Sequence, residues 1–270
     1  MSGPPGSPKS FRYEERGGAG RIVLARPQKK NALTFEVYRE LTELFESMPG
    51  RKDVRAISIT GEGSGFCSGG DVEDIIGPLL KMTGPELLAF TRMTCALIKA
   101  MRLAPQPVLA VLNGVAAGAG AVIALASDFR LAARSAKIAF LFTKVGLAGA
   151  DMGSAFLLPR VVGLARATEL LMLGDAVDAE TAESYGLVNH VFPDGQLVQE
   201  AEAFLARLVA GPRLGLAMTK DALNREISMS LESALEAEAQ AQALCMTHPD
   251  FKEGFAAFME KRPLRFEGAP

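Results

Sequence analysis

Two glycine-rich segments hold the residues most capable of chemistry in this chain. Residues 113–121 (NGVAAGAGA) follow an apolar run at 107–112, and residues 61–71 (GEGSGFCSGGD) follow a second apolar run at 56–60. Small residues after a buried strand allow bare backbone N–H groups to approach a ligand closely. Residues 122–126 are apolar and favour a helix, and the N–H groups at a helix N-terminus attract negative charge. Both segments could therefore hold one anionic oxygen.

Composition restricts what kind of protein this is. The 270 residues are 49% hydrophobic and 22% charged, with a net charge of −2, which indicates a globular protein and argues against a nucleic-acid partner. No apolar run reaches the ~18 residues of a membrane span, and residues 1–8 lack the apolar core of a signal peptide. Three cysteines and two histidines are too scattered for a disulfide framework or a metal site. We expect a cytoplasmic enzyme without a metal.

The periodicity of apolar residues predicts an α/β fold with parallel strands. Runs that favour strands alternate with helical patterns along the first two thirds of the chain. Strands are predicted at 11–15, 20–25, 56–60, 107–112, 128–132, 136–140 and 187–192, and helices at 35–48, within 72–103, and at 122–126, 165–173 and 179–184. Residues 197–209, 212–227, 231–246 and 251–261 are helical in pattern. We therefore divide the chain into a disordered tail (1–10), an α/β core (11–195) and a helical C-terminal region (196–270).

Five motifs, in order along the chain, resemble the crotonase superfamily, also called the enoyl-CoA hydratase/isomerase family. Their sequences are RPQKKNAL (26–33), GFCSGGDV (65–72), NGVAAGAG (113–120), GDAVDAETAESYGLV (174–188) and FKEGFAAFMEKR (251–262). The resemblance implies a spiral of ββα turns, with a helical C-terminal region that packs trimers, often paired as hexamers. It also implies an acyl-CoA thioester as the substrate and no separate cofactor.

By position in these motifs, the backbone N–H groups of Gly70 and Ala119 should stabilise a thioester enolate. The family usually has glycine where this chain has Ala119, but the donor is the backbone, so a methyl group is tolerable. Losing one such donor typically costs ~3 kcal/mol of transition-state stabilisation. The resemblance further assigns contacts with the CoA thioester to Lys29, Lys30, Ala32, Ser68, Gly69, Gly70, Asp71, Val72, Ala119 and Phe142. The alternative for Lys29 and Lys30 is a solvated pair on a loop.

The chain departs from the family at the two glutamates that activate water in its hydratases. Val122 and Phe142 stand at those positions, and neither side chain can transfer a proton. Residues 145–153 (VGLAGADMG) instead resemble the segment that supplies a catalytic aspartate in dienoyl-CoA and ring-acyl-CoA isomerases. Asp151 is therefore the candidate acid/base, because desolvation among apolar neighbours would raise its pKa toward neutrality. The alternative is that Asp151 caps the following helix.

Other side chains are weaker candidates. Asp71 occupies a motif position that is more often structural, His190 follows a strand in the C-terminal region, where a structural role is expected, and Cys67 lacks a base to activate it. Phenylalanines and one leucine are expected to give the pocket an apolar lining suited to a ring or a medium acyl chain: Phe66, Phe90, Phe140, Phe142, Leu147 and Phe156.

Three functions remain open at this point. The first is an isomerase or atypical hydratase of an enoyl-CoA that uses Asp151 alone. The second is a catalytically silent CoA-binding paralogue, suggested by the missing glutamates. The third is a dinucleotide-binding oxidoreductase, because Gly118-Ala119-Gly120 follows a strand. The third is weak, since Ile123 replaces the third glycine and no acid lies about twenty residues further on.

Overall fold

Two sheets organise the chain, whose computed structural model describes residues 8–266. The larger sheet has the order β1-β2-β3-β5-β7-β10, and the smaller has the order β4-β6-β8-β9. All neighbours are parallel except β1 with β2 and β8 with β9. The strands are β1 (Arg12–Arg16), β2 (Ala19–Leu24), β3 (Ala56–Gly61), β4 (Gly65–Cys67), β5 (Val108–Leu112), β6 (Val115–Ala117), β7 (Phe129–Ala133), β8 (Lys137–Ala139), β9 (Val177–Asp178) and β10 (His190–Phe192).

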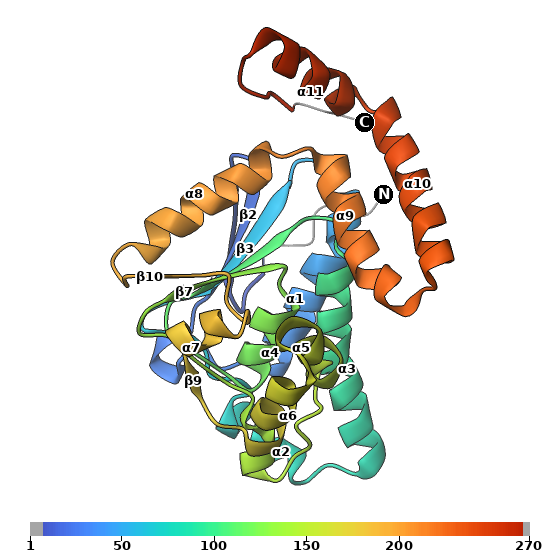
Figure 1. Ribbon diagram of the computed structural model, residues 1–270. Coiled ribbons are helices and arrows are strands. Elements are labelled where there is room, and N and C mark those ends of the chain that lie inside the picture. The colour runs from blue at the N-terminus through green and yellow to red at the C-terminus, as the bar shows by residue number, and fades with distance from the viewer. Residues whose placement is uncertain (1–7, 267–270) are drawn as a thin grey trace.

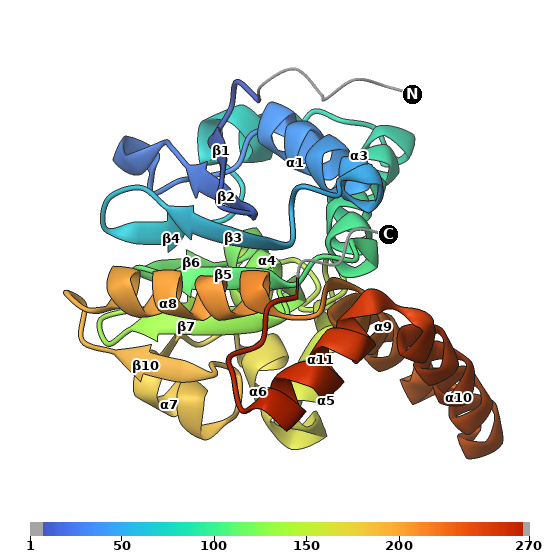
Figure 2. The ribbon, with the colours of Figure 1, turned by 90° about the horizontal axis from the view of Figure 1, so that it is seen from above.

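Successive turns of the chain repeat one pattern. A strand of the larger sheet leads into a strand of the smaller sheet, and a helix then returns the chain: β3-β4-α3, β5-β6-α4 and β7-β8-α5. This is a spiral of ββα turns (Figures 1 and 2). The helices are α1 (Phe35–Ser47), α2 (Gly77–Leu79), α3 (Gly84–Leu103), α4 (Ala119–Ala126), α5 (Ser154–Val162), α6 (Leu164–Leu173), α7 (Ala179–Ser184), α8 (Leu197–Ala210), α9 (Arg213–Arg225), α10 (Leu231–Thr247) and α11 (Pro249–Glu260).

The predicted elements are largely present. The short strand β9 lies where no strand is predicted, and three further strands differ from the prediction. The strand predicted at 187–192 is shorter, because only β10 (His190–Phe192) pairs with β7. The three-residue strands β4 and β6 lie inside the segments that the sequence presents as glycine-rich loops. Of the predicted tail at 1–10, residues 1–7 lie outside the described residues, while the N–H groups of Lys9 and Ser10 both donate to Glu40.

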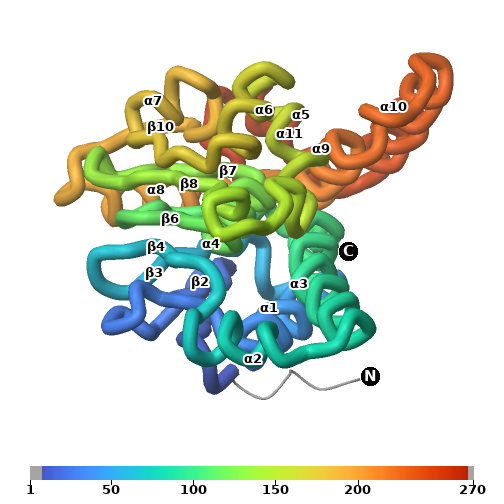
Figure 3. The backbone as a smooth tube through the Cα atoms, turned by 90° about the horizontal axis from the view of Figure 1, so that it is seen from below, coloured from blue at the N-terminus to red at the C-terminus, as the bar shows by residue number. Residues whose placement is uncertain are grey.

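Local sequence explains why the elements around the site begin where they do. Every side chain of β5 is buried, as expected for an inner parallel strand covered on both faces. The Thr34 hydroxyl caps α1 by accepting from the N–H of Val37. Thr83 and Glu86 form a capping box at the start of α3. Together these devices fix α1 and α3, which pack on each other beside the site (Figure 3).

The C-terminal helices differ in how they contact the core. Helix α8 packs on the larger sheet, against β2, β3, β5, β7 and β10. Helix α10 contains no buried residue, and it projects away from the spiral with α11 (Figures 1 and 2). Phe258, at 80% exposed, and Phe255, at 66%, leave a large apolar surface on α11. Among residues 8–266, no helix is long and apolar enough to cross a membrane.

A buried charge network fastens α9 to the core. Lys220, 6% exposed, places its ammonium 2.8 Å from an Asp128 carboxylate oxygen and donates to the carbonyl oxygens of Met101 and Gln106. Asp128 also pairs with Arg102 at 3.0 Å. Burial lowers the pKa of Lys220, while Asp128 opposes that shift. The network joins α9 to the end of α3 and the start of β5.

We expect Lys220→Met to lower the free energy of unfolding by about 3 kcal/mol, because it leaves buried oxygen acceptors without a donor. Chemical denaturation measures this value. Arg225→Met on the same helix is the control, since its exposed pair with Asp221 contributes little. Equal losses in both variants would show that the network does not hold α9.

Candidate active site

The first glycine-rich segment is fixed by a bridge to the entry motif. The N–H of Leu33 donates to the carbonyl of Gly69 at 2.8 Å, and the N–H of Asp71 donates to the carbonyl of Leu33 at 2.9 Å. In such a parallel bridge the residue between, Gly70, directs its own N–H away from Leu33. Within the described chain this N–H has no acceptor. Gly70 therefore offers a free donor at a rigid position.

The second segment places another free donor beside the first. Ala119 is the first residue of α4, so its N–H has no acceptor inside the helix. No other described residue accepts from it either. A Cβ atom added to Gly69 would lie 3.5 Å from the nitrogen of Ala119, which shows how closely the two turns approach each other. Two free backbone donors therefore lie on adjacent turns, and free donors of this kind can stabilise an oxyanion.

Glycine is required where α4 crosses β4. A Cβ atom on Gly120 would lie 2.2 Å from the carbonyl oxygen of Cys67, a backbone contact that cannot be relieved by moving a side chain. Gly118 has φ +53°, and its N–H donates to the carbonyl of Ala139 at 2.9 Å. These glycines allow the start of α4 to approach the first turn.

The positions of the family's hydratase glutamates are apolar and buried. Val122 is fully buried in α4, and Phe142 is 7% exposed. The Phe142 ring comes within 3.9 Å of the Cβ position of Gly118, next to the second turn. Hydrophobic surface thus replaces both carboxylates.

Asp151 occupies a partly buried turn just before α5. One carboxylate oxygen accepts from the N–H of Met152 at 2.9 Å, and within residues 8–266 no other group donates to this carboxylate. The hydroxyl of Ser154 accepts from the N–H of Asp151 and donates to the carbonyl of Gly149, which fixes the turn. Burial raises the pKa of Asp151 above its ordinary value, and the bond from Met152 only partly opposes this. The carboxylate does not cap α5, contrary to the alternative considered from the sequence.

Sequence reasoning missed two side chains near Asp151. Tyr38 of α1 is 2% exposed, and burial is the main cause that raises its pKa, followed by smaller electrostatic contributions of Cys67 and Asp151. Cys95 of α3 is an exposed residue, although its sulfur is partly buried. This burial and the charge of Asp151 raise the pKa of the thiol. One sequence feature could have indicated Tyr38: it is a hydroxyl-bearing residue on the apolar face of a predicted amphipathic helix.

Cys67 is a structural residue. Its side chain is fully buried, and desolvation raises the pKa of the thiol to about 12. A thiol that stays protonated near neutral pH is a poor nucleophile.

The expectation that Phe66 and Phe140 line a pocket is wrong, because both are at most 1% exposed and belong to the core. Phe156, 53% exposed, stacks under the guanidinium of Arg160.

The entry motif and the first glycine-rich segment, which carry most of the residues expected to contact CoA, lie side by side. Lys29 is exposed, and its ammonium pairs with Glu73 at 2.7 Å. Asp71 uses its carboxylate to cap the turn at Val72–Ile76 and to pair with Arg26 at 3.0 Å, which makes its side chain structural. The N–H of Ser68 donates to the carbonyl of Lys30. Lys30 and Val72 are exposed, Ala32 is buried and Ser68 is partly buried.

The described residues contain no cluster of three or more His, Cys, Asp or Glu side chains able to hold a metal ion. The candidate residues are therefore two free backbone donors on adjacent turns, with Phe142 beside the second turn, and one partly buried carboxylate on the turn before α5. Such a site suits chemistry in which negative charge develops on a carbonyl oxygen while a carboxylate moves a proton.

Comparison with known proteins agrees with this class. The family model described as enoyl-CoA hydratase/isomerase matches residues 14–269. The chain belongs to this family and is an enzyme of the enoyl-CoA hydratase/isomerase type. The alternative of a dinucleotide-binding oxidoreductase is therefore wrong.

Individual relatives support the same assignment. The chain is 36% identical to the 1,2-epoxyphenylacetyl-CoA isomerase of Escherichia coli strain K12, over 93% of this chain and 95% of that protein. It is 38% identical to a "Probable enoyl-CoA hydratase" of Rhodobacter capsulatus, over 96% and 98% of the two chains. The crystal structure of a "putative enoyl-CoA hydratase" from Streptomyces coelicolor A3(2) superposes with a TM-score of 0.96, at 50% identity and over 99% and 98% of the chains. The crotonase-like fold is thereby confirmed.

We expect the raised pKa of Asp151 to appear in the pH dependence of stability. The folded state favours the protonated carboxyl, so this group costs stability as pH rises from the ordinary value of 3.8 through the folded pKa. Asp151→Asn, which cannot ionise, should gain stability relative to the native chain over that window and keep the gain at higher pH. Denaturation at several pH values measures the difference. A difference that does not change with pH would contradict the assigned pKa shift.

Proposed function

We propose that the chain catalyses proton transfer on an enoyl-CoA, with Asp151 as the single acid/base and the N–H groups of Gly70 and Ala119 as the oxyanion hole. The observation that carries this proposal is the pair of free backbone donors at adjacent turns. Donors that have no other partner are preorganised for charge that develops during the reaction. The partly buried Asp151 supplies the base.

One carboxylate is sufficient for the proposed reaction, because the proton that it removes is the proton that it returns. Asp151 takes a proton from a carbon of the acyl chain, and the electron pair moves into the thioester carbonyl to give an enolate. Gly70 and Ala119 donate to the enolate oxygen. Asp151 then returns the proton to another carbon, which moves the double bond. The raised pKa of Asp151 supports both halves of this step, because a carboxylate with a higher pKa is a stronger base.

The apolar surroundings favour isomerisation over hydration. Hydratases of the family use two carboxylates to hold and activate water, and here Val122 and Phe142 exclude both. The name of the Escherichia coli relative, 1,2-epoxyphenylacetyl-CoA isomerase, supports an acyl group derived from an aromatic ring as the substrate. Hydration by Asp151 alone is the second candidate, since other relatives are named enoyl-CoA hydratases.

The CoA portion is proposed to bind along the edge formed by Lys29, Lys30, Ala32 and the Ser68–Val72 backbone. Lys29 is paired with exposed Glu73, and a phosphate could replace that partner at low cost, because exposed ion pairs contribute little. Phe142 lies beside the second glycine-rich turn, and in this proposal it closes the end of the site that holds the acyl group.

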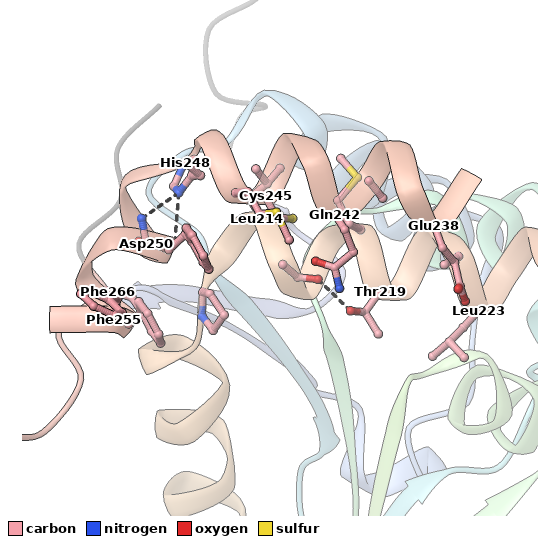
Figure 4. Close-up of a pocket in the computed structure, with 18 of the residues that line it drawn as sticks. Leu214, Thr219, Leu223, Glu238, Gln242, Cys245, His248, Asp250, Phe255 and Phe266 are labelled. Carbon is pink, nitrogen blue, oxygen red and sulfur yellow. Dashed lines mark hydrogen bonds and ion pairs between the residues drawn. The ribbon is translucent and has the colours of Figure 1, made fainter. Parts of the chain in front are cut away.

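A homotrimer or homohexamer is proposed as the assembly. Helices α9, α10 and α11 enclose an apolar groove of about 730 Å³, lined by Leu223, Cys245, Phe255 and their neighbours (Figure 4). Exposed apolar surface of this extent favours association with a partner. A second copy of the chain would cover it.

Proton exchange in D₂O tests the chemistry. We expect the enzyme to exchange acyl protons of a 3-enoyl-CoA or to shift its double bond, and Asp151→Asn to slow this by roughly 10²–10⁴-fold, a typical effect of losing a general base. CoA affinity should change by only a few-fold, because the carboxylate does not bind CoA. Proton NMR follows the exchange. Undiminished exchange in Asp151→Asn would remove Asp151 from its role.

Sedimentation tests the assembly. The native chain should sediment at three or six times the 28.6 kDa monomer mass, and Phe255→Asp should shift it toward the monomer by placing a charge in the covered groove. Lys252→Ala on the exposed side of α11 is the matched control. A native monomer at micromolar concentration would contradict the proposed assembly.

A further inference from the structure

A separate cavity of about 530 Å³ lies at the edge of the larger sheet opposite the candidate active site. Arg55 and Gln106, which line it, precede the parallel strands β3 and β5. The two glycine-rich turns follow the same strands. The length of a five- or six-residue strand, roughly 17 Å, separates the two edges. Helices α9 and α10 form the other wall.

Three cations without ion-pair partners line this cavity. Lys52, Arg55 and Arg213 contribute positive charge, and no lining residue is an aspartate or glutamate. Among the residues that the structure describes, none of the three pairs with a carboxylate. The nearby Asp53 is already paired with Arg51 at 2.8 Å. The cavity therefore has an uncompensated positive charge.

Contacts with carbonyl groups hold two of these cations in place without neutralising them. Arg55 donates to the carbonyls of Phe266 at 3.0 Å and Gly211 at 2.8 Å, and Arg213 donates to the carbonyl of Arg51 at 3.2 Å. A partly buried guanidinium that lacks a counter-ion costs free energy. An anion in the cavity would recover part of that cost.

Two polar atoms in the wall also lack partners. Gln106 is 3% exposed and donates to the carbonyls of Met48 and Val54, but its side-chain oxygen has no partner among residues 8–266. The Nε of Arg55 is equally buried and unpaired. The Arg55 Nε–H is a donor that an anionic oxygen could accept from, which adds to the benefit of occupancy, whereas the Gln106 oxygen is an acceptor and needs a donor such as water.

The remaining wall is apolar. Pro49, Pro105, Leu214, Met218 and Leu244 complete most of it. Leu214 and His248 also line the groove between α9, α10 and α11 (Figure 4). His248 faces Asp250, with 3.4 Å between Nδ1 and a carboxylate oxygen, so its charge is compensated when protonated.

We propose that this cavity binds an organic anion, with a phosphate or carboxylate group against Lys52 and Arg213 and an apolar body against Leu214 and Met218. Its volume falls within the usual range for small-molecule sites. The bound anion would join α9 and α10 to the core and stabilise the folded chain by mass action. This site is independent of the thioester site.

Isothermal titration with phenyl phosphate tests the proposal on the full chain at low ionic strength. Phenyl phosphate should bind, raise Tm, and bind more tightly than inorganic phosphate, which has no apolar body. Lys52→Glu should weaken binding by at least about tenfold, because it reverses a charge at the site. Lys52 is exposed, so this variant should fold normally. Arg213→Gln should also weaken binding.

Two control variants distinguish binding of phenyl phosphate in this cavity from binding at other cations of the protein. Lys137→Gln on β8 and Lys29→Gln beside the proposed CoA edge should bind phenyl phosphate as the native chain does. Equal affinity in the native chain and Lys52→Glu would overturn the proposal. Loss of binding in Lys29→Gln alone would place the anion at the active site and also overturn it. A native chain that shows neither heat nor a Tm shift with phenyl phosphate would likewise overturn the proposal.

Discussion

The approach of α4 to β4 is the constraint on which the candidate site depends. Gly120 passes so close to the carbonyl of Cys67 that no side chain fits between them. That contact brings the first N–H of α4 beside the turn that carries Gly70. The larger sheet and α3 pack against this part of the chain. The inner strand β5 of that sheet is wholly buried. Backbone donors held by a packed scaffold do not need to reorganise when charge develops, which is the physical basis of an efficient oxyanion hole.

The second determinant is the balance between apolar surface and charge around the donors. Val122 and Phe142 stand where the family's hydratases have the carboxylates that hold water, and this leaves Asp151 as the carboxylate that we propose for the site. Its environment is polar enough for one hydrogen bond from Met152 and apolar enough to raise its pKa. An acid/base that works near neutral pH needs such partial desolvation. In the proposed mechanism, the same environment would protect the enolate from water.

Sequence predicted elements with a capping residue or a continuous apolar run better than elements with neither. Helix α7 begins and ends at the predicted residues, because Asp178 caps its first turn, and β5 is evident from its continuous apolar run. Strands β4 and β6 could not be predicted, since three residues rich in Gly and Ala carry no strand periodicity and pair only through tertiary contacts. Motif positions predicted Gly70, Ala119 and Asp151 as site residues, and these roles stay predictions. Tyr38 and Lys220 were missed because helical periodicity marks a buried face without showing which polar group faces another element.

The central claim is that two backbone donors polarise the thioester carbonyl of a bound substrate. Infrared difference spectroscopy of Asp151→Asn with ¹³C-carbonyl-labelled crotonyl-CoA tests it most directly, because this variant should bind the thioester without turnover. We expect the carbonyl band to move to lower wavenumber than in water, as strong hydrogen bonds weaken the C=O bond. A band at its aqueous position in a saturated complex would show that Gly70 and Ala119 do not form an oxyanion hole.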